Sequence, residues 1–292
     1  MSAVLDIAGL RLSLPAPSGG RVPILRGVDL TIAPGEIHGL VGESGAGKSM
    51  IGRVLLGLQP PAAAVAADRL DVLGQDLRGL GERRRRRLLT GRLTLIPQEP
   101  MTALNPVQRI GRQVEAVLRL QLGLSGRAAA DRALALLADV RLREPERVLR
   151  RYPHELSGGM RQRVLIAMAF AAGPPLVIAD EPTTALDVTV QRDILQLIRD
   201  RQRSAGTALL FVTHDLGVVA KLCDRVTVLH AGRVVESGET AALFARPAHD
   251  YTRALLAATP RYDHPAEALR PIPPALAARL QAEAAALDAA DA

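Results

Sequence analysis

Gly42-Glu43-Ser44-Gly45-Ala46-Gly47-Lys48-Ser49 is the stretch that decides the fold of this chain. An apolar run from Ile37 to Val41 leads into it, and a helix-compatible run from Met50 to Leu58 follows it. In this strand–loop–helix context the pattern G-x-x-x-x-G-K-[ST] indicates a phosphate-binding P-loop. The alternative, a glycine-rich turn with a stray lysine, leaves the flanking strand and helix unexplained.

The residue types of the loop suit a polyphosphate. Gly42, Gly45 and Gly47 allow backbone conformations that a Cβ disfavours, so successive N–H groups can turn inward around an anion. The following helix adds the positive end of its dipole. Lys48 supplies a mobile positive charge for the terminal phosphates, and the Ser49 hydroxyl is placed to bind Mg²⁺. The residues expected to bind the phosphates are Gly42, Glu43, Ser44, Gly45, Ala46, Gly47, Lys48, Ser49 and Met50.

Composition narrows the class of protein. The 292 residues have room for one large or two modest domains, and with 2% aromatic residues the core must be aliphatic. The single cysteine, Cys223, excludes an intramolecular disulfide or a multi-cysteine metal cluster and suits a reducing compartment. The N-terminus does not read as a signal peptide, and Gly173-Pro174-Pro175 interrupts the longest apolar stretch, Val164 to Ala179. We therefore expect a soluble or peripheral protein.

The chain is basic, with a net charge of +7 and a pI near 10.5. Its densest basic cluster runs from Arg83 to Arg87, for which a solvated helix face is the favoured interpretation. Contact with lipid headgroups beside a membrane partner is the second interpretation. Nucleic acid comes third, because no aromatic residue precedes Tyr152 to stack on bases, and we expect no nucleic-acid partner.

Hydrophobic periodicity predicts an α/β chain with a β-rich start and a helical insertion. Strands are expected over residues 4–14, 28–32, 37–41, 93–97, 176–179, 208–213, 226–229 and 233–236. Helices are expected over residues 50–58, 107–120, 127–140, 144–151, 158–172 and 188–201. We predict one domain over residues 1–258, with a helical subdomain at about 99–155. Residues 259–292 form a Pro- and Ala-rich extension that ends in a helix and has no assigned function.

Two carboxylates end the apolar run Leu176 to Ala179. Asp180, at the tip of the strand, can hold Mg²⁺ directly or through water. Glu181 points the other way in a pleated strand, so it can polarise an attacking water molecule instead. One such acid would be an ordinary solvated strand end, but the pair is typical of the Walker B motif.

Ser157-Gly158-Gly159 predicts a second anion site. A serine N-cap before two glycines leaves the backbone N–H groups of a helix start open to an anion. An ordinary helix start would avoid two glycines, because each destabilises the helix.

Two further polar residues follow predicted strands. Gln98 comes after the strand that precedes the insertion, and its amide can contact Mg²⁺ or water. His214 comes after the strand 208–213, where an imidazole can contact a terminal phosphate. Either residue alone would be weak evidence, since polar residues are common at strand ends.

The order of these motifs resembles the nucleotide-binding subunit of an ATP-binding cassette (ABC) transporter over roughly residues 3 to 258. The resemblance is closer still to the oligopeptide, dipeptide and nickel importer subgroup. Four stretches carry the closer resemblance: Pro100–Pro106, Tyr152–Arg163, Ala179–Val188 and Phe244–Thr252.

The resemblance implies a P-loop NTPase fold, an ABC cassette with an N-terminal antiparallel β subdomain, which binds ATP and Mg²⁺. Ser49, Gln98 and Asp180 are the implied metal ligands, and Glu181, His214 and Gln98 the implied catalytic residues. It also implies a head-to-tail pair with a second cassette, identical or related, in which Ser157, Gly158 and Gly159 contact the partner's ATP. The other implied partners are two membrane permease subunits and, indirectly, an extracytoplasmic solute-binding protein, with the cassette at the cytoplasmic face of the inner or plasma membrane.

Two departures from the family matter. The family usually stacks adenine on an aromatic residue before the P-loop, and here the base must rely on Val22, Arg11 or Arg21. We accordingly expect ATP affinity to tolerate replacement of every tyrosine and phenylalanine. The cysteine cluster that many relatives carry near the C-terminus is also missing, so no iron–sulfur centre is expected.

These features predict an ATPase subunit that powers import of a peptide or a nickel or other metal chelate. The rival class is a non-transport ABC ATPase acting in DNA repair or translation, which would usually carry a long coiled-coil insertion or two cassettes in one chain. A P-loop kinase or GTPase would not need the Leu156–Met160 motif. The sequence does not identify the transported solute, because the cassette subunits of such transporters do not bind it.

Overall fold

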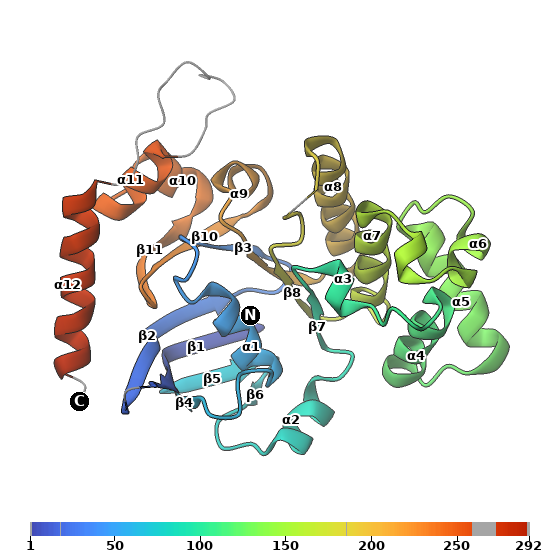
Figure 1. The fold of residues 1–292 in the computed structure, drawn as a ribbon, viewed down its shortest axis with the longest axis horizontal. Helices are drawn as coiled ribbons and strands as arrows, with labels where there is room; N and C mark the ends of the chain where they lie inside the picture. Colours follow the sequence, from blue (N-terminus) through green and yellow to red (C-terminus); the bar gives the residue numbers. More distant parts are fainter. Residues whose placement is uncertain (1, 18, 185, 259–272, 291–292) are drawn as a thin grey trace. The chain divides into compact units, whose positions relative to one another are not determined.

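The computed structural model describes residues 2–17, 19–184, 186–258 and 273–290. The described part of the chain divides into two units. The first unit comprises residues 1–82 and 210–292, and the second comprises residues 83–209. Figure 1 labels most of the helices and strands. The mixture of strands and helices confirms the predicted α/β class.

An antiparallel sheet opens the first unit. β1 (Leu5–Pro15) pairs with β2 (Arg21–Ile32), β4 (Ala64–Ala66) and β5 (Arg69–Val72), and β5 pairs with β6 (Gln75–Asp76). The sequence predicted β1 and the second half of β2. It did not predict β4, β5 or β6, because these strands are short and β4 and β6 bury no residue that would mark a hydrophobic period.

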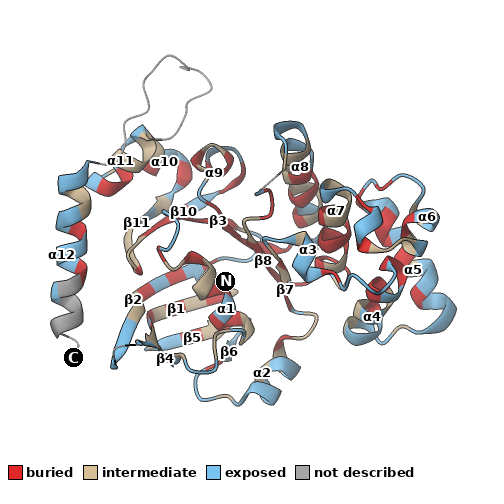
Figure 2. Ribbon diagram, in the orientation of Figure 1, coloured by how far each residue is buried: buried red, intermediate tan, exposed pale blue. Residues whose placement is uncertain are grey.

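The P-loop strand and three further strands lie together in a second sheet. They lie in the order β11 (Arg233–Glu239), β10 (Arg225–His230), β3 (Ile37–Val41), β9 (Ala208–Val212), of which β9 begins in the second unit. β3 runs parallel to β10 and is buried over its whole length (Figure 2). Every residue of β9 is buried as well. Continuous burial explains why both read as unbroken apolar runs in the sequence.

The helices of the first unit are α1, which follows the P-loop, and four near the C-terminal end of the chain. Their bounds are α1 (Lys48–Leu56), α9 (Leu216–Leu222), α10 (Thr240–Ala245), α11 (Asp250–Ala257) and α12 (Pro274–Ala290). α12 confirms the helix predicted at the end of the extension, whereas residues 259–272 of that extension lie outside the described residues.

The second unit contains two parallel strands and most of the helices. β7 (Leu93–Ile96) pairs with β8 (Leu176–Asp180), and the pairing of Ile96 with Ala179 brings their carboxyl ends to the same edge. The helices are α2 (Glu82–Leu89), α3 (Pro100–Ala103), α4 (Ile110–Leu122), α5 (Gly126–Asp139), α6 (Pro145–Arg150), α7 (Gly158–Ala169) and α8 (Val188–Ala205), with a 3₁₀ turn at Pro153–Glu155. Over the described part of the chain, no helix is both long and apolar enough to cross a bilayer.

The first helix of the insertion starts later than predicted. The sequence predicted a helix from residue 107, but α4 begins at Ile110. The buried amide of Gln113 holds the preceding residues in a turn: its Oε1 accepts from Asn105 N at 2.9 Å, and its Nε2 donates to Asn105 O at 3.0 Å and Gln108 O at 2.9 Å. A side chain of the helix thus satisfies the backbone that would otherwise extend the helix.

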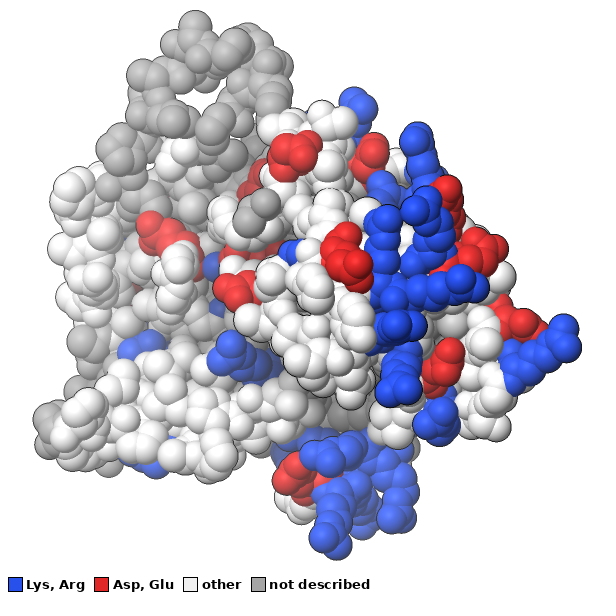
Figure 3. Space-filling view, turned by 45° about the vertical axis from the view of Figure 1, so that its right-hand side comes forward, with Lys and Arg blue, Asp and Glu red and all other residues white. Residues whose placement is uncertain are grey.

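Arginine side chains gather on the surface of the second unit (Figure 3). One cluster is α2, where Arg83, Arg84, Arg86 and Arg87 are exposed and Leu89 is the buried residue. Arg85 is half-buried, and burial lowers its pKa from the ordinary value. The exposure of α2 agrees with a solvated helix face.

The segment after Gln98 corrects one expectation. The sequence predicts that Met101 and Leu104 both lie at the surface, where a helix of a partner could bury them. The alternative is that both pack inward against the helical insertion. The structure exposes 56% of Met101 but only 1% of Leu104. α3 is too short to be held by its own hydrogen bonds, so a buried residue at its end fixes it to the unit. Only Met101 remains available for a partner.

This difference predicts unequal effects on stability. Leu104→Ala is expected to lower the free energy of unfolding by about 2–5 kcal/mol, because it leaves a cavity in the core. Met101→Ala is expected to change it by no more than about 0.5 kcal/mol, since the side chain is largely in solvent. Denaturant titration of the two variants beside the unmodified chain measures both. Equal effects would contradict the assignment of Leu104 to the core.

Candidate functional site

The P-loop connects the carboxyl end of β3 to α1 by a sharply curled backbone. Gly42 has φ 154°, and a Cβ there would lie 2.1 Å from Leu229 O. Gly47 is the N-cap of α1, with φ 99° and ψ 1°, and its Cβ would lie 2.8 Å from the Leu25 side chain. Both positions therefore require glycine, for backbone conformation and for space.

Lys48 is held at the centre of this curl. Its side chain is 5% exposed, and Nζ donates to Gly42 O at 2.9 Å and to Glu43 O at 2.8 Å. An ammonium group has three N–H donors, and here two carbonyl oxygens of the loop hold it against the loop backbone. The curled backbone and this fixed cation make the loop suitable for a polyphosphate.

The other residues predicted to bind phosphate lie in the same curled loop and in the first turn of α1. Ser44 and Gly45 are exposed, whereas Ala46 is buried and donates its N–H to Glu43 O at 3.2 Å. Ser49 and Met50 lie in the first turn of α1, where Met50 N donates to Gly47 O at 3.0 Å. The binding of Mg²⁺ by the Ser49 hydroxyl stays a prediction.

A tyrosine and a histidine from the end of the chain lie against the loop, and the sequence did not predict either. Glu43 N donates to the Tyr251 hydroxyl at 3.3 Å, and this hydroxyl donates to Glu43 Oε2, also at 3.3 Å. The rings of His230 and Tyr251 are 4.3 Å apart. The only signal in the sequence was the resemblance of the stretch Phe244–Thr252, which includes Tyr251 but says nothing of its place.

Burial determines how these two groups are charged. It raises the pKa of Tyr251 well above the ordinary value, and the nearby Glu43 carboxylate adds to the rise. Burial also lowers the pKa of His230, although Glu43 Oε2 lies 3.8 Å from its Nδ1 and opposes the change. At neutral pH, Glu43 therefore contacts an uncharged His230 ring, and the Tyr251 hydroxyl remains protonated.

His214 also lies in the first unit, two residues after β9, and is exposed. Thr213 N, beside it, donates to Leu40 O at 3.1 Å, so the chain leaving β9 passes the end of β3. Asp215 caps α9 by accepting from Val218 N at 3.1 Å. His214 is thus fixed between a buried strand and a capped helix, and its contact with a phosphate stays a prediction.

The candidates for holding adenine are in the first unit. Val22 is 46% exposed. The guanidinium of Arg21 is bound to Ser13 O at 2.7 Å and to Ala62 O at 2.9 Å, and Arg11 lies 3.9 Å from an Asp68 carboxylate oxygen. Of the three candidate contacts with adenine, the exposed aliphatic side chain of Val22 is therefore the simplest.

In the second unit the structure brings Gln98 and Glu181 together. Gln98 Nε2 donates to Glu181 Oε2 at 3.1 Å, and Thr184 Oγ1 donates to the same oxygen at 2.9 Å. Parallel pairing of β7 with β8 explains the meeting, because both residues follow the same edge. Asp180 is half-buried at the tip of β8.

Glu181 also has an unusual backbone. Its φ is 46°, in the left-handed region that residues with a side chain seldom adopt. Glu181 therefore lies beyond the end of β8, which closes at Asp180, so the side-chain alternation of a pleated strand that was expected for this pair does not apply to it. Different roles for the two acids are consistent with this arrangement.

Ser157 caps α7 as predicted. Its Oγ accepts from Met160 N at 3.3 Å, which leaves the Gly158 and Gly159 N–H groups at the helix start. Ser157 and Gly158 are exposed, and a Cβ on Gly159 would lie 2.8 Å from Val190 Cγ1 of α8. The second glycine is thus needed for packing, and the first leaves the surface open.

The predicted site residues fall into two groups, one on each unit. The P-loop and His214 belong to the first unit, and Gln98, Ser157–Gly159, Asp180 and Glu181 belong to the second.

Comparisons with known proteins agree on the family. The ABC transporter family model matches residues 25–184, and the model of the oligopeptide/dipeptide transporter C-terminal region matches residues 235–284. A probable D,D-dipeptide transport ATP-binding protein of Escherichia coli (strain K12) is 47% identical over 92% of this chain and 82% of its own length. The oligopeptide transport ATP-binding protein of Bacillus subtilis (strain 168) is 43% identical over 91% of this chain and 75% of its own length.

Solved structures support the same fold. A dimeric ATP-binding cassette in a post-hydrolysis state, bound to ADP and phosphate, superposes with a TM-score of 0.69 at 28% identity, over 81% of this chain and 98% of that chain. The predicted cassette fold is thereby confirmed. The chain belongs to the ABC transporter family, as an ATP-binding and ATP-hydrolysing subunit of the oligopeptide and dipeptide transporter group.

Proposed function

We propose that this chain energises uptake of a small solute, a peptide or a nickel or other metal chelate, through separate permease subunits. The observation that carries the peptide assignment is the match of residues 235–284 to the oligopeptide/dipeptide C-terminal region, beyond the part that all cassettes share. The alternative, an ABC ATPase of DNA repair or translation, has no such observation in its favour. We propose no nucleic-acid partner.

ATP is the proposed substrate, and the P-loop would hold its phosphates. The backbone N–H groups of Gly42–Met50 would surround them, with the Lys48 ammonium compensating their charge. Mg²⁺ would be held by Ser49, Asp180 and Gln98 and would, when bound, neutralise charge on the phosphate oxygens. A serine hydroxyl, a carboxylate and an amide are oxygen donors that suit this hard cation.

Glu181 is the proposed general base. Its carboxylate would accept a proton from water as the water oxygen bonds to the γ-phosphorus and the bond to the β,γ-bridging oxygen breaks, which gives ADP and phosphate. The bonds from Gln98 and Thr184 to one carboxylate oxygen support this role, because they fix the direction in which the carboxylate points. His214 would stabilise the charge of the γ-phosphate.

A second cassette, identical or related, is the proposed partner for each hydrolysis site. Ser157, Gly158 and Gly159 would contact the ATP of that partner through the open start of α7. The dimeric state of the solved cassette supports this arrangement. We place the pair on the cytoplasmic face of the inner or plasma membrane, peripheral to two permease subunits, with a solute-binding protein acting on the other side.

Glu181→Gln tests the catalytic assignment. It keeps the size and the hydrogen-bonding oxygen but removes the base, so ATP hydrolysis is expected to slow by about 10²–10⁴ while ATP binding is preserved. Phosphate release by the complex reconstituted with its permeases measures hydrolysis, and an equilibrium titration with ATP measures binding. Glu146→Gln, an exposed carboxylate on α6, is the matched control. Near-normal turnover of Glu181→Gln would remove Glu181 from the role of base.

The exposed Met101 tests the coupling to a permease. Because α3 begins two residues after Gln98, a permease helix that buries Met101 would be connected through α3 to the residues proposed for catalysis. Met101→Asp is expected to leave the isolated subunit folded and able to bind ATP, while assembly with the permeases and solute uptake are lost.

Met101→Leu is the control, since it keeps an apolar surface at the same position. Co-purification with the permeases and uptake into vesicles are the measurements. Unfolding of the isolated Met101→Asp subunit, or normal uptake by the complex that contains it, would each count against the coupling role.

A further inference from the structure

One residue of the P-loop is held from both sides. The Glu43 carbonyl accepts from Lys48 Nζ at 2.8 Å, and the Glu43 N–H donates to the Tyr251 hydroxyl at 3.3 Å. The same hydroxyl donates to the Glu43 carboxylate. Glu43 therefore connects the ammonium group of Lys48 to a tyrosine that lies more than two hundred positions later in the sequence.

Tyr251 is well placed to act as a fixed support. Its side chain is 0% exposed, and its ring packs on that of His230, which ends β10 next to the loop. The hydroxyl remains protonated, so it can donate one hydrogen bond and accept another. A buried aromatic ring has little freedom to move, so the position of its hydroxyl is determined by the packing around it.

The helix that carries Tyr251 is itself attached at several points. His249 caps α11 by accepting from Tyr251 N at 3.1 Å, and the Glu236 carboxylate of β11 accepts from Ala248 N at 2.8 Å and His249 N at 3.1 Å. Asp250 joins α11 to α12 through Arg279, at 2.7 Å, and also contacts Arg253 within α11.

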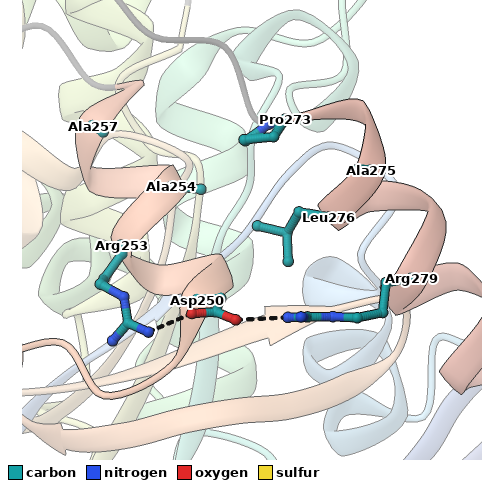
Figure 4. Close-up of a pocket in the computed structure, with 8 residues that line it drawn as sticks. All are labelled: Asp250, Arg253, Ala254, Ala257, Pro273, Ala275, Leu276 and Arg279. Carbon is teal, nitrogen blue, oxygen red and sulfur yellow. Dashed lines mark hydrogen bonds and ion pairs between the residues drawn. The ribbon is translucent and has the colours of Figure 1, made fainter.

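Figure 4 shows these charged groups on one side of the pocket between α11 and α12, with Leu276 of α12 pointing toward α11. The start of α11 is thus attached to β11 and to α12, and it carries the side chain that meets the P-loop.

We propose that Tyr251 is a positioning residue for the P-loop: its hydroxyl holds Glu43 in the conformation in which the loop binds nucleotide. The C-terminal region of the chain thereby contributes to ATP affinity without contacting ATP. This inference rests on the P-loop being the ATP site. It makes Tyr251 the exception to the expectation that every tyrosine and phenylalanine can be replaced without loss of affinity.

Tyr251→Phe is the test, because it removes the hydroxyl and keeps the buried ring. We expect the affinity for ATP with Mg²⁺ to fall about 2- to 10-fold, the range for one or two ordinary hydrogen bonds. The KM for ATP of the reconstituted complex should rise by the same factor, while kcat at saturating ATP stays within about 2-fold, since the hydroxyl does not touch the reacting atoms. Tyr152→Phe, in the second unit, is the matched control.

Equilibrium titration of the isolated full chain with ATP measures the affinity, and its thermal unfolding without nucleotide is followed alongside. Unchanged affinity in Tyr251→Phe overturns the inference. So does a loss of affinity that disappears when the titration is repeated well below the variant's unfolding transition, since that result marks a structural defect only. If the unmodified chain does not bind ATP at all, the proposed function fails instead, and the two failures are thereby distinguished.

Discussion

The hydrogen bonds from the Lys48 ammonium to the carbonyl oxygens of Gly42 and Glu43 are the interaction on which the rest of the first unit depends. A buried cation is costly unless hydrogen-bonded acceptors surround it, and these two carbonyls supply them. They can do so only because the backbone is curled back on itself, and the curl requires glycine at 42 and 47. The buried strand β3 and the helix α1 anchor the two ends of this curl. The same arrangement that satisfies the buried cation keeps it within the curl of the loop.

The second unit places the carboxylates of Asp180 and Glu181 and the amide of Gln98 at one edge of two paired strands. Parallel pairing of β7 and β8 does this with few residues, because both strands end at the same edge and the chain then leaves in separate directions. Gln98 leads into α3 and Glu181 into the turn before α8, yet their side chains meet at 3.1 Å. A displacement of α3 would therefore move Gln98 and alter its hydrogen bond to Glu181. Leu104 fixes the other end of that helix in the core.

Much of this architecture could be predicted from the sequence, and the misses have physical causes. Strands β3, β8 and β9 were predictable because burial on both faces gives continuous apolar runs, and α7 because Ser157 is a standard N-cap. The start of α4 was misplaced because a glutamine three residues into the helix ties down the residues before it, which periodicity does not register. The burial of Leu104 and the place of Tyr251 beside the P-loop were not predicted, for a shared reason. Their burial depends on contacts with distant parts of the chain, and no local pattern encodes those contacts.

The left-handed backbone of Glu181 bears on how this chain balances stability against activity. A residue with a side chain is less stable at φ 46° than glycine, by about 1 kcal/mol. Glycine would relax the turn but would remove the carboxylate. The chain therefore retains a locally unfavourable conformation at a position where a more stable residue is available. With Glu181 as the proposed general base, selection for activity and selection for stability would act in opposite directions at this position, and a screen for stability alone would be expected to discard the glutamate.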